Sequence, residues 1–156
     1  MKTPKTLVLA YHGTPGAALA EALAYEIAVP GETRLFHLLV VPDFWDGMQG
    51  DDWLNNASTR DAFGDYLENL LDEEAKAVAR GLQQRCIERG LEHAVLVRFG
   101  DPATCLVETA LQQRADLVVI GPPRPKGAPG FRSRMNLEHL ARELPAPLLM
   151  APPRTP

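Results

Sequence analysis

The chain has 156 residues, of which 46% are apolar and 23% charged, and its net charge is −4. These values are typical of one globular domain over residues 1–156, and the mild negative charge argues against nonspecific binding of nucleic acid. No apolar run reaches the ~18 residues of a membrane-spanning helix and the N-terminus lacks the pattern of a signal peptide, so we expect a cytoplasmic protein that does not enter a membrane.

The first part of the chain alternates between strand and helix patterns. Residues 7–10 are a short apolar run that predicts a strand, and 15–28 repeat apolar side chains at four-residue spacing, which predicts a helix. A second buried strand is predicted over 35–41 and ends at Pro42. A connection rich in Asp, Asn and Gly follows over 43–64.

The connection over 43–64 is long for a compact domain, and loops of this length usually carry function or disorder. The simpler alternative is that its aromatic side chains only pack the loop down. Its aspartates do not have the spacing of a calcium loop, so we predict no metal site.

The second part of the chain repeats the alternation. A long amphipathic helix is predicted over 61–89 and a third strand over 94–99. Gly100-Asp101-Pro102 then opens a helix that runs to about residue 114, with the aspartate as N-cap and the proline in the first turn. Cys86 and Cys105 fall in these helices, without zinc spacing, and we expect reduced thiols.

The last part of the chain contains two short strands separated by a loop and a helix. The strands are predicted over 117–120 and 147–151, and the helix over 136–144. The resulting order, βαβαβαβαβ, predicts an α/β fold in which a mainly parallel sheet is covered by helices on both faces, a doubly wound three-layer sandwich.

The loop over 121–134 is the strongest indication of a ligand. It contains four basic residues and no acidic one, and it leads from a buried strand into a helix, where many α/β proteins hold a phosphate. One interpretation is that arginine side chains clamp an anion; the other is a solvated loop that balances the acidic 43–65 segment. The basic residues are Arg124, Lys126, Arg132 and Arg134.

Four stretches of the chain together resemble the universal stress protein family. They are GDP at 100–102, ADLVVIG at 115–121, LLVVP at 38–42 and EHLARELPAPLLMAP at 138–152. The resemblance covers nearly the whole chain. It implies a five-stranded sheet in the order 3-2-1-4-5, with the adenine nucleotide alpha hydrolase-like, flavodoxin-like topology.

The same resemblance exposes a departure from the family's ATP-binding pattern, G-x2-G-x9-G-[ST] after the fourth strand. Counted from Gly121, the next positions hold Arg124, Arg134 and Met135. Glycines there let backbone N–H groups approach a phosphate, whereas an arginine side chain fills that space. Met135 also lacks the hydroxyl group that would bond a phosphate.

The first loop departs as well. ATP-binding members have Asp-Gly-Ser after the first strand, and the matching residues here are His12, Gly13 and Thr14. An imidazole therefore replaces a carboxylate acceptor. Val41 does match the family position beside adenine. The candidate ligand site thus consists of these four residues with Gly121 and the arginines at 124, 132 and 134.

From this resemblance we expect a stress-response or regulatory module that acts by binding or interaction, with weak or absent ATP binding and no catalysis. The alternative is a true nucleotide-binding member with slow ATP hydrolysis and a rearranged phosphate loop. The ligand stays open between ATP, AMP and another anion. The related ATP-pyrophosphatases are disfavoured because their serine- and glycine-rich first loop is absent.

The last predicted strand, over 147–151, indicates that two copies of the chain pair with each other. In this family it lies at the sheet edge and pairs with its counterpart in a homodimer. Here it is apolar and bracketed by prolines, and symmetric pairing would cover the open edge. We therefore expect a homodimer, with a further protein partner unknown. The strand residues are Pro147, Leu148, Leu149, Met150 and Ala151.

Overall fold

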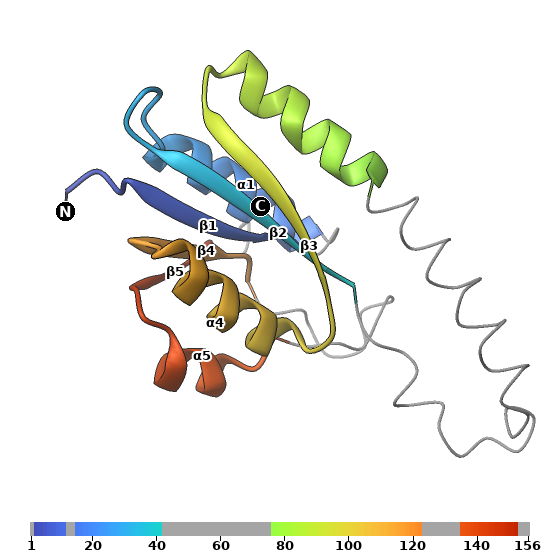
Figure 1. The fold of residues 1–156 in the computed structure, drawn as a ribbon, viewed down its shortest axis with the longest axis vertical. Helices are drawn as coiled ribbons and strands as arrows, with labels where there is room; N and C mark the ends of the chain where they lie inside the picture. Colours follow the sequence, from blue (N-terminus) through green and yellow to red (C-terminus); the bar gives the residue numbers. More distant parts are fainter. Residues whose placement is uncertain (1, 12–14, 42–75, 123–134, 153–156) are drawn as a thin grey trace, which may run out of the picture.

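The computed structural model describes residues 2–11, 15–41, 76–122 and 135–152 (Figure 1). They form one five-stranded, all-parallel sheet in the order β3-β2-β1-β4-β5, as predicted from the sequence. The elements in chain order are β1 (Thr6–Tyr11), α1 (Pro15–Ile27), β2 (Arg34–Val41), a helix over 76–88, β3 (Glu92–Phe99), α4 (Pro102–Gln113), β4 (Leu117–Ile120), α5 (Leu137–Glu143) and β5 (Leu148–Met150).

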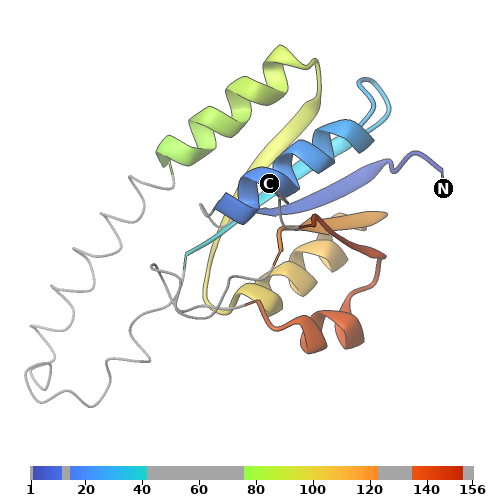
Figure 2. The ribbon, with the colours of Figure 1, turned by 180° about the vertical axis from the view of Figure 1, so that it is seen from behind.

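Helices cover both faces of the sheet. Helix α1 and the helix over 76–88 lie on one face, and α4 and α5 lie on the other (Figures 1 and 2). Alternate strand residues point to opposite faces. On β2, for example, Leu35 packs with α1 whereas Phe36 and Leu38 pack with α4. This three-layer arrangement is the doubly wound fold predicted from the sequence.

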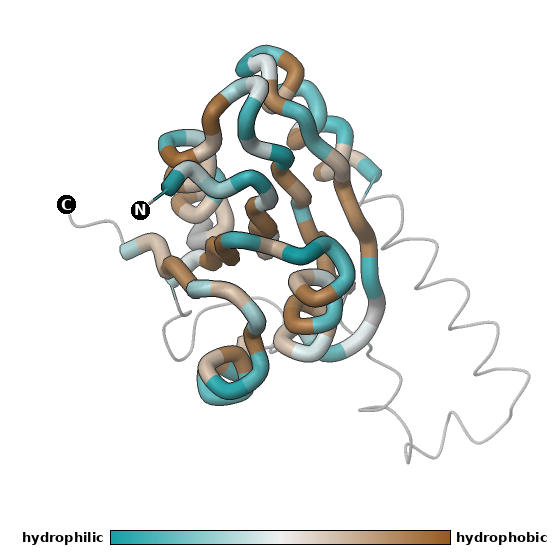
Figure 3. The backbone as a smooth tube through the Cα atoms, turned by 60° about the vertical axis from the view of Figure 1, so that its left-hand side comes forward, coloured by the Kyte–Doolittle hydropathy of each residue, from teal (hydrophilic) through white to brown (hydrophobic). Residues whose placement is uncertain are grey.

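The central strands β1 and β4 are apolar over residues 7–10 and 117–120 because both of their faces are buried. In Figure 3 the hydrophobic stretches of the chain gather in the interior, and the hydrophilic ones lie mostly on the outer helix faces and turns. Leu7, Val8 and Leu9 of the central strand β1 are completely buried. Each such side chain contributes about 1.5–3 kcal/mol relative to an exposed one.

Element ends follow the sequence signals closely. The helix over 76–88 stops at Gly90, whose φ of 67° lets Leu91 N–H donate to the Cys86 carbonyl at 3.0 Å. Asp101 caps α4, as predicted, by accepting from Thr104 N–H at 2.9 Å. Strand β3 begins two residues earlier than predicted because Glu92 and His93 pair with the start of β2.

A side chain from the turn before β4 also ties down the start of β1. The Oδ2 atom of Asp116 accepts from the backbone N–H groups of Lys5 and Thr6, at 3.0 and 2.9 Å. The neighbouring strands β1 and β4 are thereby held in register over Leu7–Leu117, Val8–Val118 and Leu9–Val119.

Of the predicted long helix over 61–89, the structure describes the part from residue 76 onward, and the connection over 43–64 lies outside the described residues. Among the helices that are described, none is long and apolar enough to cross a membrane.

Candidate functional site

The crossover connections place a switch point of strand order at the centre of the sheet. β1 and β4 are parallel neighbours, so their carboxyl ends meet at one edge. From β1 the chain passes to α1 on one face, and from β4 it passes to α5 on the opposite face (Figures 1 and 2). Ligands of open α/β sheets bind where the connections diverge in this way.

Two of the predicted site residues have a described backbone at this edge. Val41 is the last residue of β2, opposite Phe99 in the ladder, and Gly121 follows β4 directly and is half-buried. The predicted site residues His12, Gly13, Thr14, Arg124, Arg132 and Arg134 lie outside the described residues. Their roles stay predictions, and the structure supplies the frame from which their loops depart.

Two residues that follow the basic loop have structural roles. Met135 is partly buried and packs against the apolar cluster that contains Leu106 of α4 and Leu140 of α5. Asn136 caps α5, with its Oδ1 atom accepting from His139 N–H at 3.0 Å. The sequence signal for this cap, an asparagine directly before an amphipathic helix, went unused in the sequence analysis.

The Gly100-Asp101-Pro102 motif also has a structural role, at the end of β3. Gly100 has a φ of 128°, a conformation that favours glycine. Asp101 Oδ2 accepts from both the backbone N–H and the hydroxyl group of Thr104, each at 2.9 Å. The motif therefore turns the chain from β3 into α4, and Asp101 Oδ2 already accepts two hydrogen bonds there.

A polar cluster that the sequence did not predict lies on the opposite helical layer. Glu21 of α1 is 6% exposed, and its Oε1 atom accepts from the hydroxyl group of Tyr25 at 2.8 Å and from Arg85 Nε. Its Oε2 atom accepts from an Arg85 terminal nitrogen at 3.1 Å. We call these three residues the Glu21 cluster. It joins α1 to the helix over 76–88.

Neighbouring groups extend the Glu21 cluster. Arg89 stacks on the Tyr25 ring, with its guanidinium carbon 4.2 Å from the centroid. The Cys86 sulfur lies 4.0 Å from the Tyr25 hydroxyl oxygen. Burial raises the pKa of the Tyr25 hydroxyl well above its usual range, and it also raises the pKa of the Cys86 thiol.

Arg85 is held as a cation by its partner. Its hydrogen bonds to Glu21 raise its pKa further above its already high ordinary value. The Glu21 cluster is therefore an ion pair between a buried carboxylate and a partly exposed guanidinium, with the Tyr25 hydroxyl group as a second donor, and it ties the helix over 76–88 to α1. Across the described ranges, no group of three or more His, Cys, Asp or Glu side chains is placed to hold a metal ion.

Comparison with known proteins decides the family. The model of the universal stress protein family matches residues 4–152. The chain belongs to the universal stress protein family. No curated protein sequence is similar enough to count as a match.

Solved structures agree with this assignment. A universal stress protein from Burkholderia pseudomallei is 25% identical, with 98% of this chain and 99% of that chain covered and a TM-score of 0.70. The hypothetical protein MJ0577 has a TM-score of 0.78 at 15% identity, over 99% of this chain and all of that one. An Arabidopsis thaliana family member with AMP bound is 13% identical and has a TM-score of 0.61, over 94% and 90% of the two chains.

Proposed function

We propose that this universal stress protein is a cytoplasmic regulatory module that acts by binding or interaction rather than by catalysis, and that it binds ATP weakly or not at all. If a nucleotide occupies the carboxyl edge, the chemistry of the loops favours one with a single phosphate, such as AMP. The alternative is a true ATP-binding member whose basic loop takes a different path from the family pattern.

The packing of Met135 carries this proposal. Its position in the family pattern belongs to a serine or threonine whose hydroxyl group bonds a phosphate. Here the thioether lies against the apolar cluster around Leu106 and Leu140. A partly buried thioether packed against this cluster supplies no phosphate ligand, and truncating the Met135 side chain would also cost packing energy.

The AMP-bound relative supports the choice of ligand. That protein shares the fold and holds a nucleotide with one phosphate. A monophosphate has no β- or γ-phosphate that requires a glycine cradle. The charged side chains of Arg124, Arg132 and Arg134 are suited to bind one phosphate by bidentate hydrogen bonds.

Titration calorimetry with ATP, ADP and AMP, with and without magnesium, tests the proposal. We expect ATP to bind with a dissociation constant above about 100 μM, and AMP to bind at least as tightly as ATP. Replacing Arg124 and Arg134 with alanine should abolish AMP binding and its salt dependence. A charge-matched control replaces Arg89 and Arg142 with alanine. These two arginines lie at the C-terminal ends of helices, away from the carboxyl edge of the sheet, so AMP binding should stay intact.

Low-micromolar ATP binding by the unaltered protein would overturn the proposal and favour the alternative. A gain-of-function variant adds a second check. Changing Arg124→Gly, Arg134→Gly and Met135→Ser restores the family pattern, and we expect ATP affinity to rise at least about tenfold, or about 1.4 kcal/mol.

We further propose that the protein is a homodimer through β5. This strand forms one edge of the sheet, and Leu148, Leu149 and Met150 are only partly buried. Two backbone hydrogen bonds join β5 to β4: the Pro147 carbonyl accepts from Val118 N–H, and Ala151 N–H donates to the Ile120 carbonyl. By alternation, the backbone groups of Leu148 and Met150 point to the open edge, where a second copy can pair with them.

Light scattering coupled to size-exclusion chromatography tests the dimer. We expect twice the mass of the 17.1 kDa chain. Met150→Pro removes one outward N–H and should shift the protein to a monomer, whereas Met150→Leu should remain dimeric. A monomer for the unaltered protein at micromolar concentration would refute this proposal, and it would leave the nucleotide proposal untouched.

A further inference from the structure

His37 is the most unusual buried residue of the described chain. It lies in the middle of β2, is 0% exposed, and neither ring nitrogen has a hydrogen-bond partner. Its side chain shares the strand face of Leu35 and Leu39, which is covered by α1 and the helix over 76–88. An unpartnered polar group in the core is costly, so its presence calls for an explanation.

The charged and titratable groups around His37 come from three elements. Glu21 belongs to α1, Arg85 to the helix over 76–88, and His93 to β3. Both carboxylate oxygens of Glu21 already accept hydrogen bonds from Tyr25 or Arg85. The imidazole therefore stays neutral in the folded protein. Burial lowers its pKa to about 4, although the Glu21 charge opposes this and the His93 and Arg85 charges add to it.

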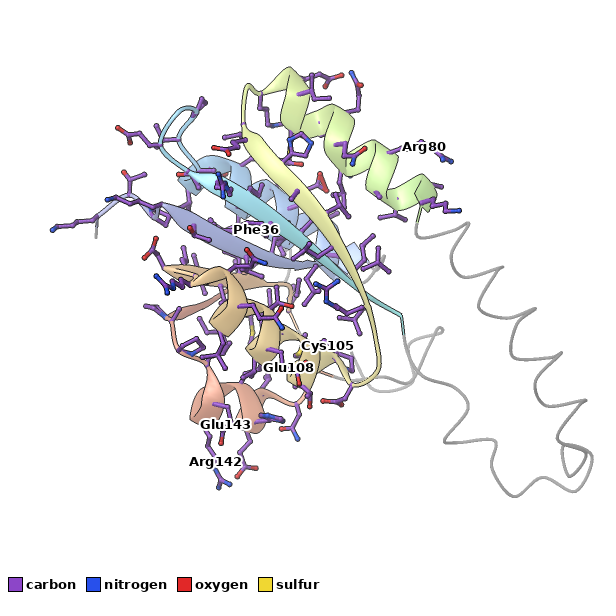
Figure 4. The ribbon with its side chains drawn as sticks, viewed as in Figure 1. Phe36, Arg80, Cys105, Glu108, Arg142 and Glu143 are labelled. Carbon is purple, nitrogen blue, oxygen red and sulfur yellow. The ribbon has the colours of Figure 1, made fainter. Side chains whose placement is uncertain are left out.

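Over residues 76–88 two side chains of the helix are fully buried, Leu82 and Cys86, and one ion pair, from Arg85 to Glu21, joins it to α1. Leu82 packs against Leu39 of β2, and the residues alongside, Val78, Ala79, Val95 and Val97, are only partly buried. Farther along, Cys86 packs into the α1 cluster and Arg85 reaches Glu21. Its outer side faces solvent, and Arg80 extends away from the sheet (Figure 4). This small attachment makes the helix a candidate for local opening.

We propose that the helix over 76–88 is an acid-released element, with His37 as the buried trigger beneath it. When the helix undocks, the Glu21–Arg85 pair separates and His37 meets water, where an imidazole takes up a proton near pH 6.5. In the docked state the buried His37 imidazole does not take up a proton at that pH. Each proton taken up by the undocked state favours undocking, so acidification shifts the equilibrium toward release.

The size of the effect follows from proton linkage. Above pH 6.5 His37 is neutral in both states and undocking is independent of pH. Between pH 6.5 and about 4 only the undocked state is protonated, so the undocking constant increases as the pH falls. From pH 7.5 to pH 5 the expected increase is about 30-fold.

The two cysteines provide the measurement. Cys86 lies on the released helix and Cys105 on α4, on the opposite face of the sheet, and both are buried. Each thiol is labelled with 4,4′-dithiodipyridine, which forms a mixed disulfide and releases pyridine-4-thione, and peptide mass spectrometry separates the two sites. Rates are divided by those of the urea-unfolded protein at the same pH, which gives a protection factor for each thiol.

We expect Cys86 to be less protected than Cys105 at every pH, with a shallower dependence on urea, because undocking exposes less surface than unfolding. Its protection should fall about 30-fold between pH 7.5 and pH 5. His37→Leu, or His37→Gln if the leucine variant does not fold, should remove this pH dependence. His139→Gln, on the opposite face of the sheet, should preserve it.

Two results would overturn the proposal. Equal protection and equal urea dependence for both thiols would mean that Cys86 reacts only through global unfolding. A pH dependence of Cys86 that persists in both His37 variants would mean that another group is the trigger.

Discussion

Replacing Arg85 with alanine is expected to lower the free energy of unfolding by about 3–5 kcal/mol, because it leaves the Glu21 carboxylate buried without its counter-ion. The Glu21 side chain is 8% exposed, and Tyr25 alone would remain as a donor to it. The reverse change is milder. Glu21→Gln leaves an Arg85 side chain that is 39% exposed and can be hydrated, so we expect a loss of about 1–2 kcal/mol.

Urea unfolding of the single and double variants measures this asymmetry. Once Arg85 is absent, Glu21→Gln should restore part of the lost stability, since it removes the stranded charge. Arg89→Ala is the matched control: it removes an exposed arginine that stacks on Tyr25, and it should cost about 1 kcal/mol or less. Equal losses for Arg85→Ala and Glu21→Gln would show that the carboxylate is not isolated from water.

Replacing His37 with leucine is expected to stabilise the protein by about 1–3 kcal/mol at pH 7.5, since two buried ring nitrogens without partners are removed. The stability difference between the leucine variant and the unaltered protein should increase as the pH falls. The unfolded chain binds a proton at His37 below pH 6.5 and the folded chain does so only below about pH 4. Unaltered protein therefore loses stability as the pH falls through this window, by about 3 kcal/mol in total.

Urea titrations at pH 7.5, 6 and 4.5 check this prediction. The difference between the His37→Leu variant and the unaltered protein should widen by about 2.5 kcal/mol over that range. His139→Gln, on α5, should show the pH dependence of the unaltered protein. A leucine variant that is less stable at pH 7.5 would indicate that the imidazole has a partner, such as an ordered water molecule.

The sequence was sufficient for the strands and the helix ends because these depend on local patterns, whereas the sheet order was implied by the resemblance to the family. Apolar runs identified all five strands, and Asp101 with Pro102 marked the start of α4. The universal stress protein family was also apparent, from short stretches in a fixed order. Strand ends were less exact, as at β3, because ladder pairing with β2 extends the strand over polar residues.

The Glu21 cluster could not be predicted in the same way. Glu21 and Tyr25 are four residues apart on one helix, but Arg85 is 64 residues from Glu21. No local pattern links partners across so long a connection. His37 did leave a signal, as the polar residue inside the apolar run LFHLLVV, but a single histidine in a strand does not by itself indicate a role.

The candidate ligand site was only partly accessible from sequence and structure together. The strand order positions the ends of β1, β2 and β4 at one edge of the sheet. Residues 123–134 of the basic loop and residues His12, Gly13 and Thr14 lie outside the described residues. What the structure adds is that the partly buried Met135 packs against the apolar cluster of α4 and α5, which spacing alone did not reveal.

The pairing of β1 with β4 has a consequence for how the chain folds during synthesis. These central strands are about 110 residues apart, as are the Lys5, Thr6 and Asp116 groups that tie them. Pairs so distant in sequence form slowly, because a long segment must be ordered first. One edge of β1 therefore stays open until β4 has left the ribosome, and over that interval the nascent chain presents a buried strand to the cell and its chaperones.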